Sequence, residues 1–200
     1  MKTRFVRVEY SCERTDSLSR YYFRLIKNLK YSEFFTDNEE TSKKWKEAFR
    51  RTFIQSNFHV KYDAIKMIGK GSFARVYLVE NNITKKQFAV KAFSKEYLLN
   101  QSKGKESIIN EIDIMKVLEH PNIMRLEEIH ESNNSIYLVL ELLQGGELFE
   151  HISKQKRIDV KDVKHIMSNL LDALCYLKKK GIMHRDLKPE NMILQDKGNL

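Results

Sequence analysis

Two glycines between two strand-like runs restrict the fold of this chain more than any other feature. Residues 62–68 alternate as a β-strand does, residues 69–74 read Gly-Lys-Gly-Ser-Phe-Ala, and residues 75–79 form a second run of β-branched and aromatic types. In a dinucleotide-binding fold a helix would begin directly after the glycines. Because a strand follows instead, we expect the glycines at the tip of a hairpin, where backbone amides can approach phosphate oxygens without a side chain in between.

A second constraint lies near the C-terminus, in the stretch His-Arg-Asp-Leu-Lys-Pro-Glu-Asn at residues 184–191. The ring of Pro189 fixes a backbone dihedral angle and indicates a loop, and loops on a rigid frame often carry catalytic side chains. The carboxylate of Asp186 suits the acceptance of a hydroxyl proton, the ammonium group of Lys188 suits a moving phosphate, and the amide oxygen of Asn191 suits Mg²⁺. These residue types together favour phosphoryl transfer over an ordinary polar turn.

An ion pair is predicted between a strand and a helix. Lys91 lies in the apolar strand-like run 88–93, where a lysine needs an anion nearby. Residues 107–118 predict an amphipathic helix, and Glu111 lies on its apolar stripe. A carboxylate among apolar neighbours is costly unless it is paired, so we expect Glu111 to pair with Lys91.

Together these motifs resemble the eukaryotic Ser/Thr protein kinase family, in the style of the calcium/calmodulin-dependent kinases. The resemblance covers residues 62–200 and implies an α+β fold. Residues 62–142 would form an antiparallel five-stranded N-lobe with one main helix, and residues 143–200 the first helices and the catalytic loop of a helical C-lobe. The family pattern has a third glycine where this chain has Ala74, which is a mild departure.

The resemblance implies transfer of the γ-phosphoryl group of ATP to Ser/Thr hydroxyl groups of proteins, with Mg²⁺ as cofactor. Asp186 would be the catalytic base, Lys188 would neutralise the moving phosphoryl group, Lys91 and Glu111 would hold the phosphates, and Asn191 would bind Mg²⁺. The expected nucleotide contacts are Ile68, Gly69, Lys70, Gly71, Ser72, Phe73, Ala74, Arg75, Val76, Ala89, Lys91, Glu141, Leu143 and Ile193.

Part of this set would bind the adenine ring. By resemblance, Val76, Ala89 and Ile193 would enclose the ring, while the Glu141 carbonyl and the Leu143 amide would meet its edge. Ordinary core packing of the apolar residues is compatible with the same sequence.

Two further carboxylates bear on the protein substrate. Glu147 and Glu190 match family positions that receive substrate arginines, so the resemblance implies a preference for Arg two or three residues before the acceptor. A lysine at position 188 is typical of Ser/Thr rather than tyrosine specificity.

The N-terminal part, residues 1–56, shows a different sequence pattern from the rest of the chain. Residues 20–26 and 30–35 predict strands, and residues 41–54 predict a helix with the single tryptophan. Strands followed by such a helix resemble the C-terminal end of a pleckstrin-homology domain, about half of which would be present, and no residue is assigned to lipid. A helix that packs on the kinase lobe through its aromatic stripe is the alternative. Residues 57–61 are expected to be a linker.

Charge and cysteine content set outer bounds. The net charge of +9 permits contact with anionic membrane, although an ordinary basic surface is the favoured interpretation, and no nucleic-acid partner is expected. Cys12 and Cys175 are far apart and lack metal-like spacing, which predicts free thiols in a reducing compartment. The first residues lack the apolar run of a signal peptide, so we expect a cytoplasmic protein.

A long helix is predicted from about Asp159 to Lys180. Its expected buried face consists of Val163, Ile166, Met167, Leu170, Leu174 and Leu177. No Asp-Phe-Gly follows within the 200 residues, so a kinase domain would be truncated here, and we expect the chain alone to be inactive and this helix to expose apolar surface. Two alternatives to an active kinase stay open: a truncated non-catalytic ATP-binding or scaffold protein, and a membrane-recruited interaction module.

Overall fold

The computed structural model describes residues 6–15, 18–71, 74–102, 104–155 and 157–196. The chain divides into two compact units, each of which is described by itself. The first comprises Met1–Val117 and Leu126–Glu141, and the second Leu118–Arg125 and Leu142–Leu200. In the described residues, no helix combines the length and the apolarity needed to cross a bilayer.

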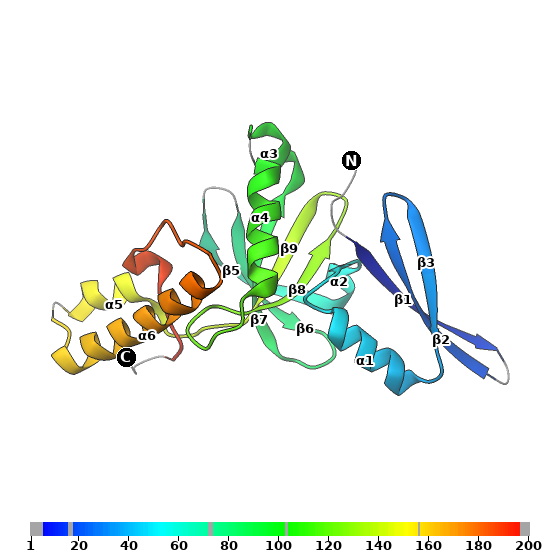
Figure 1. Ribbon diagram of the computed structural model, residues 1–200, viewed down its shortest axis with the longest axis horizontal. Helices are drawn as coiled ribbons and strands as arrows, with labels where there is room; N and C mark the ends of the chain where they lie inside the picture. The colour runs from blue at the N-terminus through cyan, green and yellow to red at the C-terminus, as the bar shows by residue number, and fades with distance from the viewer. Residues whose placement is uncertain (1–5, 16–17, 72–73, 103, 156, 197–200) are drawn as a thin grey trace. The chain divides into compact units, whose positions relative to one another are not determined.

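A nine-stranded sheet forms the first unit (Figure 1). In chain order its strands are β1 (Arg7–Thr15), β2 (Leu18–Lys27), β3 (Lys30–Thr36), β4 (Ile54–Gln55), β5 (Tyr62–Lys70), β6 (Arg75–Asn81), β7 (Gln87–Ser94), β8 (Leu126–Glu131) and β9 (Ser135–Leu140). Across the sheet the order is β3-β2-β1-β4-β8-β9-β7-β6-β5. The five strands from β5 to β9 pair in antiparallel fashion, which confirms the predicted five-stranded sheet.

The N-terminal strands β1, β2 and β3 form an antiparallel meander. Two of them lie where strands were predicted, while β1 was not predicted. Asn28 and Leu29 connect β2 to β3 with positive φ angles of 51° and 67°, as in the tight hairpin turns whose twist matches that of the strands. The assignment of this segment to the pleckstrin-homology family stays a prediction.

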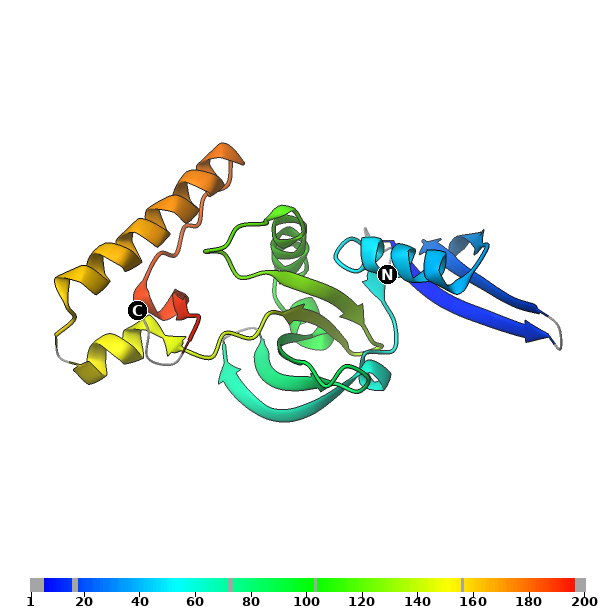
Figure 2. The same cartoon turned by 90° about the horizontal axis from the view of Figure 1, so that it is seen from below.

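Helix α1 (Glu39–Phe49) follows the meander and packs against β2 and β3 (Figure 2). Asn38 caps its N-terminus by accepting a 2.8 Å hydrogen bond from the amide of Thr41. The aromatic stripe of the helix lies against the strands, since the Phe23 ring centroid is 5.7 Å from that of Trp45 and 5.2 Å from that of Phe49. The alternative in which this stripe packs on the kinase lobe is therefore wrong.

The predicted helix over residues 41–54 ends early. Its last residues belong to β4, where the Ile54 amide donates a 3.0 Å hydrogen bond to the Val6 carbonyl. Strand β4 pairs in parallel with β1 on one side and β8 on the other. The backbone of residues 54–55 thus finds partners in two strands, which a continued helix would not offer.

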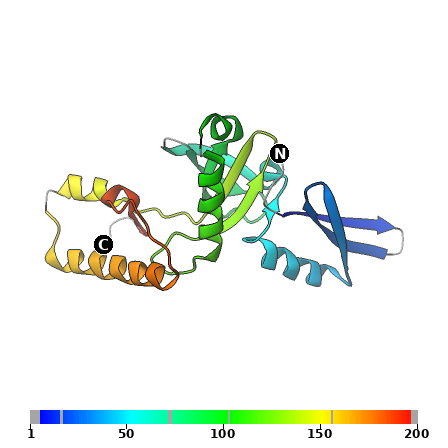
Figure 3. The same ribbon diagram turned by 45° about the horizontal axis from the view of Figure 1, so that its top comes forward.

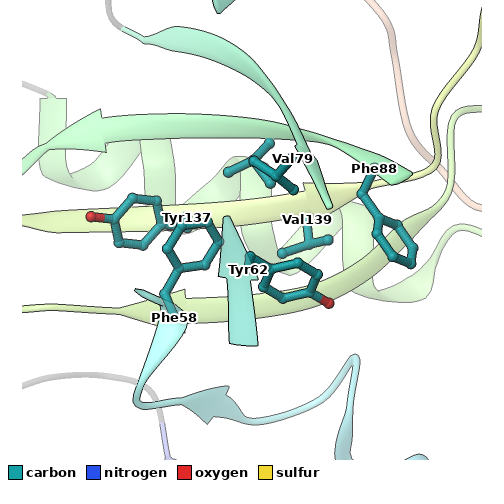
Figure 4. Packing of buried hydrophobic residues seen from close by; sticks show 7 residues of the cluster. Phe58, Tyr62, Val79, Phe88, Tyr137 and Val139 are labelled. Atoms are coloured by element: carbon teal, nitrogen blue, oxygen red, sulfur yellow. The ribbon is translucent and has the colours of Figure 1, made fainter. Parts of the chain in front are cut away.

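Residues 57–61, expected to be a linker, include a short helix, α2 (Phe58–Lys61). Its first side chain enters the core: the Phe58 ring stacks on Tyr137 at a centroid distance of 4.0 Å (Figure 4). Val90 and Val139 complete this part of the cluster, on the face of the sheet opposite Lys91, because side chains alternate along β7. The connection is therefore also a core element.

Helices α3 (Lys95–Asn100) and α4 (Gly104–Val117) belong to the same unit. Helix α4 begins three residues before the predicted helix at residues 107–118 and ends one residue before its end, and it buries Ile108 and Ile112. Helix α3 was not predicted. Its sequence signal is Ser94, an N-cap type of residue, whose side chain accepts from the amide of Tyr97 at 3.4 Å.

The second unit contains β10 (Gly146–Glu147), α5 (Leu148–Gln155), α6 (Val160–Lys179), a 3-10 turn η1 (Pro189–Asn191) and β11 (Ile193–Leu194). Strands β10 and β11 pair with each other, and α5 packs against η1 (Figure 3). Asp159 caps α6 by accepting a 3.1 Å hydrogen bond from the Lys161 amide. Gly181, at φ +69°, ends it.

The apolar face predicted for α6 is only partly buried, in line with the expectation that this helix exposes apolar surface in this chain. Val163 and Met167 are 42% and 45% exposed, whereas Ala173 and Leu177 are buried. The buried side turns towards residues 118–125, where the Tyr176 hydroxyl accepts a 2.9 Å hydrogen bond from the Glu119 amide. The N-terminal half of the helix is left with an apolar strip open to solvent.

Candidate functional site

Strand β7 and helix α4 bring Lys91 and Glu111 together. The Lys91 Nζ atom lies 2.6 Å from Glu111 Oε1. Lys91 shares a face with Ala89 because side chains alternate along the strand, and α4 presents Glu111 beside its buried Ile108 and Ile112. The predicted pairing of lysine and glutamate is thus present, with both side chains about one-third exposed.

A cavity of about 410 Å³ lies beside this ion pair. Small residues of the hairpin, Gly71, Ala74 and Val76, line it together with Lys91 and Glu111. A cationic ammonium group next to small side chains and accessible backbone is what a phosphate group needs, so the residues present fit a nucleotide phosphate.

The glycine-rich segment forms the tip of the β5–β6 hairpin, as predicted. The Gly71 amide donates a 2.9 Å hydrogen bond to the Ala74 carbonyl and narrows the tip. Ile68 is 45% exposed, and Lys70 and Arg75 are also exposed. The predicted contacts Ser72 and Phe73 lie outside the described residues.

The residues expected around the adenine ring divide between the two units. In the first unit, Val76 lies opposite Lys91 in the ladder, and Ala89 lies opposite Leu140. Glu141 is the last residue of this unit, whereas Leu143 and Ile193 belong to the second. The role of this set in nucleotide binding stays a prediction.

The loop after α6 gathers two of the predicted side chains around the Asp186 carboxylate. Asn191 Nδ2 donates 2.8 Å hydrogen bonds to both the backbone oxygen and Oδ2 of Asp186. Lys188 Nζ lies 3.2 Å from the same Oδ2 atom. Pro189 opens the 3-10 turn that brings Asn191 back towards Asp186, so residues within six positions of one another form this cluster.

The cluster keeps the Asp186 carboxylate charged. Hydrogen bonds from Asn191 and then Lys188 lower the pKa of Asp186 below its ordinary value. Two neighbours that we did not single out also take part. His184 Nδ1 accepts a 3.3 Å hydrogen bond from the Asp186 amide, and Arg185 has a left-handed φ of +69°, which costs energy in a non-glycine residue and is common at functional sites.

Asn191 is the predicted Mg²⁺ ligand. Its Nδ2 group is engaged by Asp186, so its Oδ1 atom is the end of the amide suited to a cation. Mg²⁺ is usually held by one or two protein oxygens together with water and substrate phosphates, and a single amide oxygen beside a carboxylate fits that pattern. Within the described residues, no group of three or more His, Cys, Asp or Glu side chains forms a separate metal site.

The two carboxylates predicted to meet substrate arginines lie in the second unit and are exposed. Glu147 in β10 pairs across the ladder with Ile193 in β11. Glu190 lies in η1, three residues before Ile193. Short local connections therefore carry both glutamates on the same small scaffold as the Asp186 loop.

Comparison with known proteins adds an independent line of support. The profile of the family described as protein kinase domain matches residues 62–200. Calcium-dependent protein kinase 4 of Plasmodium falciparum is 40% identical over 148 residues, which cover 72% of this chain and 28% of that protein. CBL-interacting serine/threonine-protein kinase 24 of Arabidopsis thaliana is 41% identical over 140 residues, which cover 70% of this chain and 31% of that protein. The chain thus spans less than one third of the length of these two relatives.

Proposed function

We propose that this chain, which belongs to the protein kinase family, supplies the nucleotide-binding and catalytic groups of an enzyme that transfers the γ-phosphoryl group of ATP to Ser/Thr hydroxyl groups of proteins. The proposal covers the complete protein that contains the chain, in the cytoplasm. The two cysteines are exposed and free, which suits a reducing compartment.

The observation that carries the proposal is the cluster around Asp186. Its carboxylate is held by the Asn191 amide at 2.8 Å and faces the Lys188 ammonium group at 3.2 Å. In this geometry an ionised carboxylate can orient and deprotonate a substrate hydroxyl group, while the ammonium group neutralises charge on the phosphoryl group.

The ion pair in the first unit supplies the second function, which is to hold the nucleotide. Glu111 orients Lys91, and the Nζ atom opens towards the cavity beside the glycine-rich hairpin. Mg²⁺, which Asn191 would help to hold, neutralises phosphate charge when it is bound. The chain contributes orientation, positive charge and a proton acceptor.

The test is a phosphoryl-transfer assay on the longest natural protein that contains this chain, because we expect the 200-residue chain alone to be inactive. Asp186→Asn should lower the transfer rate by about a hundredfold or more, since it removes the proton acceptor, and should leave ATP affinity near that of the unsubstituted protein. Glu150→Gln, which alters an exposed i,i+4 pair with Lys154, is the matched control.

The same assay separates the alternative. If the complete protein binds ATP but transfers no phosphate, and Asp186→Asn changes nothing, the non-catalytic ATP-binding or scaffold function is the better account.

The substrate preference follows from the exposed glutamates. Two carboxylates on one scaffold, Glu147 and Glu190, support a preference for Arg two or three residues before the acceptor Ser or Thr. Glu147→Gln in the complete enzyme should lower kcat/KM for such a peptide by about tenfold, because a charge-assisted hydrogen bond is lost. A peptide library that shows no arginine preference would remove this part of the proposal.

A contact between the N-terminal part and anionic lipid is a separate proposal. Lys43 and Lys46 line a cavity of about 280 Å³ beside Tyr10 and Glu39. Lys43 Nζ already lies 2.9 Å from Glu39 Oε1, so a lipid headgroup would have to compete with that carboxylate. Sedimentation of the whole chain with anionic vesicles, and with neutral vesicles as control, tests the contact, and equal sedimentation with both would set it aside.

A further inference from the structure

The N-terminal segment, residues 1–56, is joined to the five strands β5–β9 through β8. Strand β4 lies between β1 and β8 and pairs in parallel with both. Strand β4 therefore pairs with the edge of β8 that faces away from β9. Its residues precede residues 62–200, the kinase-like region. An edge strand covered in this way is no longer free to pair with another chain.

Basic residues from the N-terminal segment then meet carboxylates of β8. Arg50 contacts Glu127 at 2.8 Å, and Arg7 contacts Glu131 at 2.9 Å. Glu127 is only 1% exposed, and Glu131 has a side chain that is 9% exposed. A buried carboxylate without a cation is costly, so these contacts help to stabilise β8.

Glu131 differs from Glu127 in that a second cation shares it. Lys95, the first residue of α3, places Nζ 2.6 Å from Glu131 Oε1 while Arg7 contacts Oε2. Lys95 also donates a 2.7 Å hydrogen bond to the Ser132 carbonyl. Burial works to raise the pKa of Glu131, but hydrogen bonds from Lys95 and Arg7 outweigh it, and the pKa lies below its ordinary value.

Helix α3 in turn is packed closely on the start of α4. A Cβ atom at Gly104 would lie 2.6 Å from the Leu98 carbonyl oxygen, so the two backbones are in direct contact there. Leu98 also lines the cavity into which Lys91 and Glu111 open. A shift of α3 would therefore displace α4, the helix that carries Glu111.

We propose that Glu131 is a positioning residue for the Lys91–Glu111 pair, and that the N-terminal segment holds α4 in place through the chain of contacts Arg7–Glu131–Lys95–α3. The significance for catalysis rests on the proposed kinase function, whereas the positioning itself does not. Residues outside the kinase-like region thus help to set the geometry of the nucleotide site.

The test is amide hydrogen exchange of α4, together with acetylation of Lys91 followed by mass spectrometry, on the whole 200-residue chain. Arg7→Ala should raise both the exchange of residues 104–117 and the labelling of Lys91 by about fivefold, as expected for loss of one partly buried ion pair. Lys95→Ala should do the same. The double variant should add little, because both changes break the same path.

Arg24→Ala is the matched control, because it removes an N-terminal cation whose partner, Glu33, lies outside β8 and α3. It should leave α4 and Lys91 unchanged. Arg7→Lys, which retains the cation, should behave like the unsubstituted chain. Equal effects of Arg7→Ala and Arg24→Ala on α4, or full additivity of Arg7→Ala and Lys95→Ala, would overturn the proposal. Neither readout requires phosphoryl transfer, so failure here is distinguishable from failure of the kinase proposal.

Discussion

Glu128 shows how one buried acidic residue depends on its neighbours. Its carboxylate accepts hydrogen bonds from Lys61 Nζ at 2.6 Å and from the Tyr62 hydroxyl group at 2.9 Å. It also lies 2.8 Å from His130 Nε2. Burial works to raise the pKa of Glu128, but the contacts with His130 and Lys61 outweigh it and lower the pKa to about 2. The residue therefore stabilises the fold only while it is ionised.

This pKa predicts an acid-dependent stability. The folded state binds the Glu128 proton less tightly than the unfolded state, so the stabilisation is present at neutral pH and is lost as the pH falls from about 4.5 towards about 2. One pKa unit corresponds to about 1.4 kcal/mol, so Glu128→Gln should cost on the order of 3 kcal/mol at pH 7. Urea unfolding at several pH values should show that the difference in free energy of unfolding between Glu128→Gln and the unsubstituted chain becomes smaller in acid. Glu80→Gln, at a pair with Lys85 that is more exposed than Glu128, is the control. A difference between Glu128→Gln and the unsubstituted chain that does not change with pH would contradict the assignment.

At the scale of the element, the four-residue helix α2 contributes to stability mainly through one buried side chain, that of Phe58. Phe58 is 6% exposed and stacks on Tyr137, whereas Val60 on the same helix is 75% exposed. Phe58→Ala should lower the free energy of unfolding by about 3–5 kcal/mol, as truncation of a buried aromatic residue does. Val60→Ala should change it by less than about 0.5 kcal/mol. Chemical denaturation of both variants measures the difference, and equal effects would show that α2 is a linker after all.

The long helix α6 depends on its cap. The Asp159 side chain satisfies an N-terminal amide that has no partner within the helix. Asp159→Ala should reduce stability by about 1 kcal/mol, and Asp159→Asn should retain most of it because asparagine also accepts the hydrogen bond. Thermal unfolding followed by circular dichroism at 222 nm compares the two, and a similar loss in both variants would argue against capping.

At the scale of the whole molecule, the N-terminal segment and the kinase-like region share one sheet. Deletion of residues 1–56 would remove β4 and the cations Arg7 and Arg50, and would leave the edge of β8 open. We expect a lower thermal midpoint and concentration-dependent association, because an open edge strand pairs with other chains. Thermal scans and light scattering on the chain of residues 57–200 test this, and an unchanged midpoint without association would show that the segment is an independent appendage.

Much of the candidate site was predictable because its signals are local. The hairpin at residues 69–74 follows from glycines between two strand patterns, and the Lys91–Glu111 contact follows from a charge in each of two apolar elements. The resemblance of residues 184–191 to a known motif anticipated the Asp186 cluster, since Pro189 and the 3-10 turn lie within a few residues of it. The hairpin and the Asp186 loop are each contained in a short stretch of chain, and for the ion pair each of the two elements has its own local pattern.

The sequence by itself thus determined the strands of the hairpin and the stripe of α4, because periodicity is a property of neighbouring residues. The residues expected to carry phosphoryl transfer came from the resemblance to the kinase family. Only the tertiary structure decided that Ile54 and Gln55 form a strand between β1 and β8 and that Phe58 enters the core. It also decided which part of the apolar face of α6 is covered, since Ala173 and Leu177 are buried whereas Val163 and Met167 stay exposed. A two-residue strand has no periodic pattern of its own, and the burial of a single side chain depends on partners far away in sequence.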